Sequence, residues 1–152
     1  MSVKAKIILV AIICGLGLGY LLFINNKKEP ALMEIDGVLY EETLKKGYEI
    51  TGDYKLHDVK KDGKKICDLT FLKEYDMYDS YQLLASSYVG RTKIEENSDS
   101  YARYIVWSEE DGDKKTYFMY VQLNDCNLSY LFSGASSESG VRNAYKGVRY
   151  KK

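Results

Sequence analysis

The longest apolar run of the chain lies near its amino terminus. After Lys6 the sequence continues to Ile24 as IILVAIICGLGLGYLLFI, without a charged side chain. A helix rises about 1.5 Å per residue, so a segment of this length crosses a hydrocarbon layer of roughly 30 Å while satisfying its own backbone groups. The pattern predicts a transmembrane anchor within residues 1–24, a polar linker over residues 25–33 and one domain over residues 34–152.

Three other interpretations of the amino-terminal segment fit its residues less well. A buried helix of a soluble domain is one of them, but burial is hard to arrange for a long run at the very terminus. A cleaved signal peptide needs a small-x-small site after a shorter apolar run, and here Gly17-Leu18-Gly19 is followed by further apolar chain. A lipoprotein needs a small residue before its cysteine, whereas Ile13 precedes Cys14. We therefore expect the span to stay attached as a signal anchor.

Lysines flank the predicted span on both sides, with Lys4 and Lys6 before it and Lys27 and Lys28 after it. The positive-inside rule therefore favours a cytoplasmic amino terminus only slightly. The segment before the span is short, and nearly all of the polar chain follows it. We expect a single-pass protein of the bacterial cytoplasmic membrane whose body lies on the extracytoplasmic side.

Two Asp-Gly pairs mark β-hairpins beyond the linker, because aspartate and glycine tolerate the positive φ of tight hairpin turns. The pairs are Asp62-Gly63 and Asp111-Gly112, and the second lies in a loop predicted over residues 108–115. The paired strands are expected at 54–60 and 65–73 for the first hairpin and at 103–107 and 116–123 for the second. Further strands are predicted at 48–51 and 128–132.

The best helix signal lies over residues 76–89. Met77, Tyr81, Leu84 and Tyr88 fall on one face of a helix with 3.6 residues per turn. An aspartate, Asp76 or Asp79, is expected to cap its start, and the glycine that follows is expected to end it.

The remaining segments have weaker patterns. Residues 35–47 fit a short helix, because Tyr40 and Leu44 lie about one turn apart and Gly47 suits its end. The other predictions are a polar connection at 91–100, a Ser/Gly loop at 133–140, and a short helix followed by an edge strand at 141–152.

These elements together predict an α+β domain, in which an antiparallel sheet carries one or two packed helices. The second hairpin is apolar or aromatic on both faces, so we expect it in the centre of the sheet. The helix is expected on one face.

The charge of the chain is balanced, with 22 basic and 22 acidic side chains. Residues 1–30 take four of the lysines and a single glutamate, so the body is mildly acidic. A protein without a strong positive field does not attract nucleic acid. We therefore expect no nucleic-acid partner.

Three cysteines are present, and Cys14 lies in the predicted span. Cys67 alternates with polar neighbours in its strand, which places it on the core face. Outside the cytoplasm, Cys67 and Cys126 are free to oxidise, so we expect a disulfide between them. A zinc site is poorly supported, because the body has no CxxC motif and His57 is its only histidine.

The sequence carries no recognisable catalytic or cofactor motif. His57 is the only imidazole base available, and its strand pattern predicts that it faces solvent. The acidic run at residues 109–113 lacks the D-x-D-x-D-G spacing of a calcium loop. We therefore predict no catalytic residue, no metal site and no cofactor.

The chain contains 15 tyrosines, which fits either high strand content or a tyrosine-rich contact surface. Strand content is the simpler explanation.

Two charged segments are candidate partner-binding surfaces. The preferred one, which suits a basic partner, is the acidic hairpin tip with Trp107, Glu109, Glu110, Asp111 and Asp113, and the competing one is the basic tail with Arg142, Arg149 and Tyr150.

Three functions remain open from the sequence. The first is a membrane-anchored envelope protein whose soluble domain binds another protein, as an immunity protein, an inhibitor or an accessory subunit does. The second is an envelope hydrolase that uses carboxylates. The third is a structural component that assembles through its sheet edges and its span, where Gly15 and Gly19 have the small-xxx-small spacing of closely packed helices.

Overall fold

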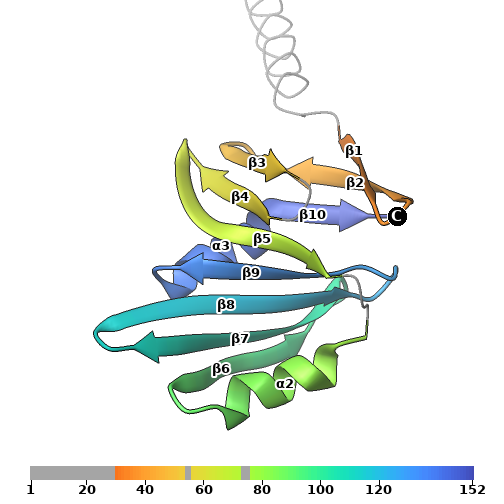
Figure 1. Cartoon of the computed structure of the whole chain (residues 1–152). Helices are drawn as coiled ribbons and strands as arrows, with labels where there is room; N and C mark the ends of the chain where they lie inside the picture. Colours follow the sequence, from red (N-terminus) through yellow and green to blue (C-terminus); the bar gives the residue numbers. More distant parts are fainter. Residues whose placement is uncertain (1–29, 54–55, 73–75) are drawn as a thin grey trace, which may run out of the picture.

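The computed structural model describes residues 30–53, 56–72 and 76–152. These residues form two antiparallel sheets and two helices, which confirms the predicted small α+β domain (Figure 1). The larger sheet has seven strands in the order β3-β4-β5-β9-β8-β7-β6. The smaller sheet has three strands in the order β1-β2-β10.

The first described elements form a hairpin, so the helix predicted over residues 35–47 is wrong. Strand β1 spans Ala31–Ile35 and β2 spans Val38–Leu44, with Ile35 paired to Val38. Asp36 and Gly37 both have positive φ, 48° and 79°, as a type I′ turn requires. The third Asp-Gly pair of the chain therefore also makes a tight hairpin turn, and the helical spacing of Tyr40 and Leu44 reflects alternate residues on one face of a strand.

The hairpin around Asp62-Gly63 is confirmed. Strand β4 spans Leu56–Lys61 and β5 spans Lys64–Leu72, and Asp62 and Gly63 again have positive φ. Strand β3, Tyr48–Asp53, pairs antiparallel with β4 and lies at one edge of the larger sheet.

The second hairpin is also confirmed, but its strands are longer than predicted. Strand β7 spans Ala102–Asp111 and β8 spans Lys114–Leu123, so only Gly112 and Asp113 form the turn. Most of the predicted eight-residue loop is therefore paired strand. Strand β9, Ser129–Ala135, pairs with both β8 and β5 and extends into the segment predicted as a Ser/Gly loop.

Strand β6, Arg91–Ser98, replaces the polar connection predicted over residues 91–100. It is the edge strand beside β7, and most of its side chains are exposed. An edge strand exposed to solvent has polar side chains and lacks the apolar alternation on which the prediction relied.

Helix α2, Tyr78–Ser87, confirms the predicted helix, and Met77, Tyr81 and Leu84 pack against the sheet. Its cap residue is Met77, without a side-chain hydrogen bond, so the predicted aspartate cap is wrong. Helix α3, Glu138–Gly147, and strand β10, Val148–Lys151, confirm a helix followed by an edge strand. The α3 helix begins earlier than predicted because the Ser137 hydroxyl accepts a hydrogen bond from the Gly140 N–H.

The two helices cover opposite faces of the larger sheet, so the prediction of a helix on one face was incomplete. Residues of β7 alternate between the faces: Ile105 and Trp107 pack with α2, whereas Tyr104 contacts Tyr145 of α3. Because both faces of β7 and β8 are covered, the second hairpin is apolar on both sides, as its sequence indicated.

The predicted disulfide is absent, because Cys67 and Cys126 are both buried free thiols. Pairing of Asp68 with Ser133 places Cys67 near the end of β9, whereas Cys126 precedes the first residue of that strand. The register sets Cys67 opposite Gly134, which at about 3.3 Å per residue lies roughly 17 Å along β9 from Ser129, whereas a disulfide requires Cα atoms within about 7 Å.

No helix among the described residues is long and apolar enough to cross a membrane. The predicted span at residues 6–24 lies outside the described residues. The anchor therefore remains a prediction from the sequence.

The end of α3 leaves no space for a side chain at Gly147. A Cβ atom there would overlap the Tyr48 ring, and this ring is itself buried. We predict that Gly147→Ala lowers the free energy of unfolding by about 1–3 kcal/mol, because a buried aromatic ring must move. Thermal unfolding in detergent measures the effect. The neighbouring exposed substitution Lys146→Ala is the control, and equal melting temperatures for both variants contradict the packing described here.

Candidate functional site

Exposed apolar side chains occur along the second half of α2 and in the turn between α2 and β6. Leu83 is 65% exposed, Tyr88 60% and Val89 fully exposed. The Arg91 guanidinium lies 4.6 Å from the centre of the Tyr88 ring, which fixes the orientation of that ring. We call these four residues the α2–β6 corner.

The backbone reverses direction within the corner. Tyr88 leaves the helix in an extended conformation, and Gly90 has a φ of 81°. A Cβ atom at Gly90 would lie 3.0 Å from the Glu110 carbonyl oxygen, so both the conformation and the close approach favour glycine. This tight reversal leaves Val89 without neighbours to cover it.

The β7–β8 hairpin tip lies beside the corner. The Glu110 N–H donates a 2.8 Å hydrogen bond to the Gly90 carbonyl oxygen. Arg91 pairs with Glu109 across the strands, and its Nε lies 2.6 Å from the Glu109 carboxylate. The structure thus places the predicted acidic surface at the β7–β8 hairpin tip next to the apolar α2–β6 corner, which lies about twenty residues earlier in the sequence.

Half of the acidic tip is neutralised within the chain. Glu109 binds Arg91 and accepts a 3.3 Å hydrogen bond from the Trp107 indole, and Glu110 lies 2.9 Å from Lys115 Nζ. Asp111 and Asp113 are exposed, and among the described residues neither forms an ion pair. These two aspartates, at the turn, are the remaining negative groups of the predicted surface.

Trp107, predicted as a partner-binding residue, is only 2% exposed. Its ring is stacked on Phe118 at 5.3 Å and lies 5.9 Å from Tyr81. The indole therefore belongs to the core under α2 and is not available to a partner, which corrects the prediction.

The predicted basic tail is also occupied by internal contacts. Tyr150 is 2% exposed, and its hydroxyl donates to Glu42. The Arg149 guanidinium lies 4.3 Å from the ring centres of both Tyr101 and Tyr145. Tyr150 therefore cannot contact a partner, and Arg149 already has two aromatic neighbours.

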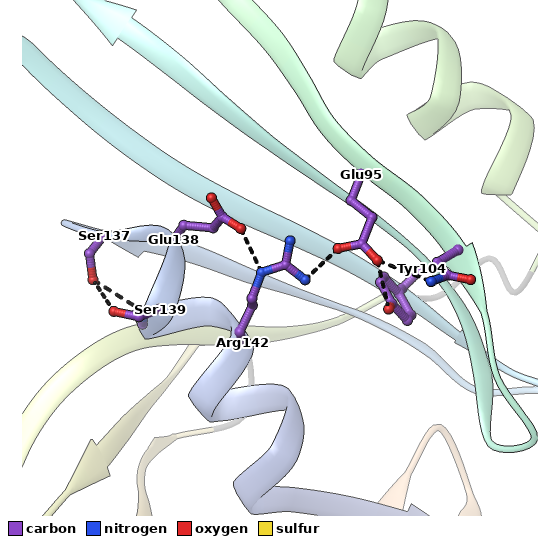
Figure 2. Close-up of polar contacts among 8 residues, drawn as sticks. Glu95, Tyr104, Ser137, Glu138, Ser139 and Arg142 are labelled. Atoms are coloured by element: carbon purple, nitrogen blue, oxygen red, sulfur yellow. Dashed lines mark hydrogen bonds and ion pairs between the residues drawn. The ribbon is translucent and has the colours of Figure 1, made fainter.

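Arg142 of α3 bridges two carboxylates, as Figure 2 shows. Its Nε lies 2.6 Å from Glu138 in the same helix, and a terminal nitrogen lies 2.5 Å from Glu95 of β6. Glu95 also accepts 3.1 Å hydrogen bonds from Asn97 and from the Tyr104 hydroxyl. The Asn97 and Arg142 hydrogen bonds hold the pKa of the Glu95 carboxyl below its usual range. This network ties α3 to the edge strand β6.

The two cysteines and the histidine among the described residues are buried. Burial raises the pKa of Cys67 to about 12, and burial followed by the Asp125 charge raises that of Cys126, so both stay protonated thiols. His57 is 9% exposed and packs edge-on against Phe71, which corrects the prediction that it faces solvent. Among the described residues, no cluster of three potential metal ligands is found.

The α2–β6 corner was missed from the sequence. The helical pattern assigned Tyr88 to the buried face with Met77 and Leu84, but α2 ends at Ser87, so Tyr88 turns away. A signal was present: Val89 precedes Gly90 and Arg91, where an apolar residue in a polar turn has no core to enter.

Comparison of the chain with protein-family models, with curated proteins and with solved structures gives no significant match.

Removal of the Arg142 side chain should weaken the contact between α3 and β6. We predict that Arg142→Gln lowers the free energy of unfolding at pH 7 by about 2 kcal/mol, because two partly buried carboxylates lose their cation. The pKa of Glu95 is lowered by folding, so its stabilisation is complete above the ordinary glutamate value of about 4.3 and is lost as pH falls through the folded value.

The difference between Arg142→Gln and the parent protein should therefore shrink below about pH 4. Thermal unfolding over a series of pH values measures it. Lys115→Gln, which breaks a more exposed ion pair, is the matched control and should cost less than about 0.5 kcal/mol. A pH-independent loss in Arg142→Gln contradicts the assigned role of Glu95.

Proposed function

We propose that this chain is a single-pass membrane-anchored protein of the bacterial envelope whose domain binds another protein through the α2–β6 corner. The observation that carries the proposal is the exposure of Leu83, Tyr88 and Val89 within seven residues of the chain, with Tyr88 held against the partly buried Arg91. Exposed apolar groups that lie together mark interaction surfaces more often than scattered ones do.

The composition of the corner supports a protein partner. Tyrosine and arginine are enriched among residues that dominate binding energy, and Tyr88 is the one exposed tyrosine among those that the structure describes. The Arg91 contact limits the freedom of the Tyr88 side chain before binding, so less conformational entropy is lost when a partner covers it.

The position of the corner supports a role at a distance from the membrane. Strand order places β6 at the edge of the larger sheet opposite β3, and Figure 1 shows α2 on the far side of the domain from β1. If residues 6–24 span the bilayer, the chain enters the domain at β1. The corner then faces away from the lipid, where a soluble or secreted partner reaches it.

The chemistry of the surface defines the partner that fits it. Tyr88 and Val89 require an apolar recess, and Asp111 and Asp113 at the adjacent turn favour basic groups around that recess. An immunity-like or inhibitory protein of this kind neutralises a target by occupying its surface, and it needs no catalytic group of its own.

The alternative of a carboxylate hydrolase receives less support. A carboxyl group that acts as a general acid has a raised pKa. Among the described carboxyl groups, those with a shifted pKa are all lowered, by hydrogen bonds to side chains or backbone, and they are Asp58, Glu95, Glu96 and Asp99. These groups are suited to ion pairs and caps.

Substitutions in the corner should abolish partner binding without unfolding the domain. We predict that Tyr88→Ala weakens the complex by about 2 kcal/mol, roughly thirtyfold in Kd, and that Val89→Asp has at least as large an effect. The test is co-purification of the full-length protein from detergent extracts of its own membranes, with partner stoichiometry measured for each variant. Leu39→Asp, an exposed leucine of β2, is the matched control. A partner retained by Val89→Asp but lost by Leu39→Asp places binding elsewhere.

The membrane anchor and its orientation have a separate test. We predict that alkaline phosphatase fused after Lys152 is active, because the body lies outside the cytoplasm, and that the protein sediments with membranes after a high-salt wash. Intact mass should retain Met1 or Ser2. An inactive phosphatase fusion, with fluorescence from a cytoplasmic reporter in its place, reverses the orientation.

A further inference from the structure

The two sheets end in edge strands of different character. Strand β6 carries several charged side chains, and its pairing with β7 is interrupted by a bulge between Lys93 and Glu95. Charges and bulges on an edge strand discourage pairing with another chain. Strand β1 lies at the edge of the three-stranded sheet and reads ALMEI, with Glu34 as its one charged residue. Its pairing with β2 is regular along its whole length.

The backbone groups on the free side of β1 follow from the hairpin turn. In a two-residue hairpin the residues that flank the turn exchange both hydrogen bonds, and here these are Ile35 and Val38. Alternate residues along β1 therefore bond to β2, and the residues between them, Leu32 and Glu34, direct their N–H and C=O groups to the free edge. Both residues are exposed.

We propose that β1 pairs antiparallel with β1 of a second copy of this chain, with Met33 at the two-fold axis. Leu32 then lies opposite Glu34 of the other copy, and Ala31 lies opposite Ile35. The outward-directed backbone groups of Leu32 and Glu34 face each other across the axis in this register and complete four hydrogen bonds. The result is one continuous sheet in the order β10-β2-β1-β1-β2-β10.

The side chains of β1 are compatible with this register. Neither glutamate lies opposite the other, so no like charges face each other directly. Leu32, 71% exposed in the single chain, gains a neighbour on the outer face of the sheet. Met33 already packs against the core on the inner face, and Met33 of the second copy extends that apolar surface.

The proposed membrane anchor favours this pairing, and to that extent the inference rests on the proposed function. Four main-chain hydrogen bonds between five-residue strands hold a dimer poorly at low concentration. Residues 25–30 separate Ile24 from β1, and six residues reach at most about 20 Å. Two copies whose spans pack through Gly15 and Gly19 therefore keep their β1 strands at a high effective concentration.

Site-directed cross-linking of the full-length protein in its own membranes tests the pairing. In a Cys14→Ser background, Met33→Cys places two thiols across the two-fold axis, and mild oxidation should convert most of the protein to a disulfide-linked dimer. Leu39→Cys is the matched control, because two β2 strands lie three strand spacings apart, about 14 Å, beyond the reach of a disulfide. Equal amounts of dimer from Met33→Cys and Leu39→Cys overturn the proposal.

A second variant blocks the edge without disturbing the hairpin. Leu32→Pro removes an N–H that faces the free edge, and proline is tolerated on an edge strand at such a position. Combined with Met33→Cys, it should abolish the dimer. Cys67, 1% exposed, should stay protected from thiol reagents, which verifies that the domain is folded. A folded Leu32→Pro variant that still forms the Met33→Cys dimer contradicts pairing through β1.

The same samples separate failure of this inference from failure of the anchor. Sedimentation reports the anchor independently, and the comparison of Met33→Cys with Leu39→Cys is made in whichever fraction holds the protein. A dimer specific to Met33→Cys in a soluble protein supports the β1 pairing and rejects the anchor. A membrane-bound protein without this dimer keeps the anchor and rejects the pairing.

Discussion

The attachment of the small sheet to the large one depends on the aromatic contacts of Tyr150. Its ring lies between Phe71, at 5.2 Å, and Tyr130, at 5.5 Å, in edge-to-face geometry with both. Its N–H donates to the Tyr101 hydroxyl, and its own hydroxyl donates to Glu42 of β2. Burial and the Glu42 charge raise the pKa of Tyr150 far above its ordinary value, so the phenol stays a neutral donor. Val148, which is also fully buried, and Arg149, which lies against Tyr101 and Tyr145, add to this attachment of β10.

Many of the tyrosines of this chain pack, like Tyr150, where the small sheet and the helices meet the larger sheet. Phenol rings fill the space between two sheets, and their hydroxyls satisfy polar groups that phenylalanine would leave unpaired. Tyr145 illustrates the combination, because its hydroxyl donates to Asp99 while its ring faces the Arg149 guanidinium. The strand-content explanation of the tyrosines therefore fits most of those that the structure describes. Tyr88 is the exception, which is why its exposure carries weight in the functional proposal.

The two proposed surfaces lie on different sheets: β1 is an edge of the three-stranded sheet, and the α2–β6 corner lies at an edge of the seven-stranded sheet. Strand β1 follows the predicted anchor, so a contact between copies there costs little additional ordering of the chain. The α2–β6 corner lies beyond the strands β5, β9, β8 and β7. This separation allows both surfaces to be occupied together, because neither shares a residue with the other. The Arg142 bridge between α3 and β6 holds that far edge to the body of the domain.

Local signals in the sequence determined the α+β class, the hairpins at Asp62-Gly63 and Asp111-Gly112, and the existence of α2 and of α3 followed by β10. Turn chemistry and apolar periodicity act over a few residues, so they can be read along the chain. Only the tertiary structure decided which charged side chains have a partner within the domain and which remain available to another molecule. Arg142, Arg149 and Glu109 look alike in sequence as exposed ions, yet each finds a partner from a distant strand or helix. It also decided that β6 is a strand, that Cys67 and Cys126 lie apart, and that Tyr88 faces solvent. Each of these depends on which segments become neighbours in space, and local propensity carries no information about that choice.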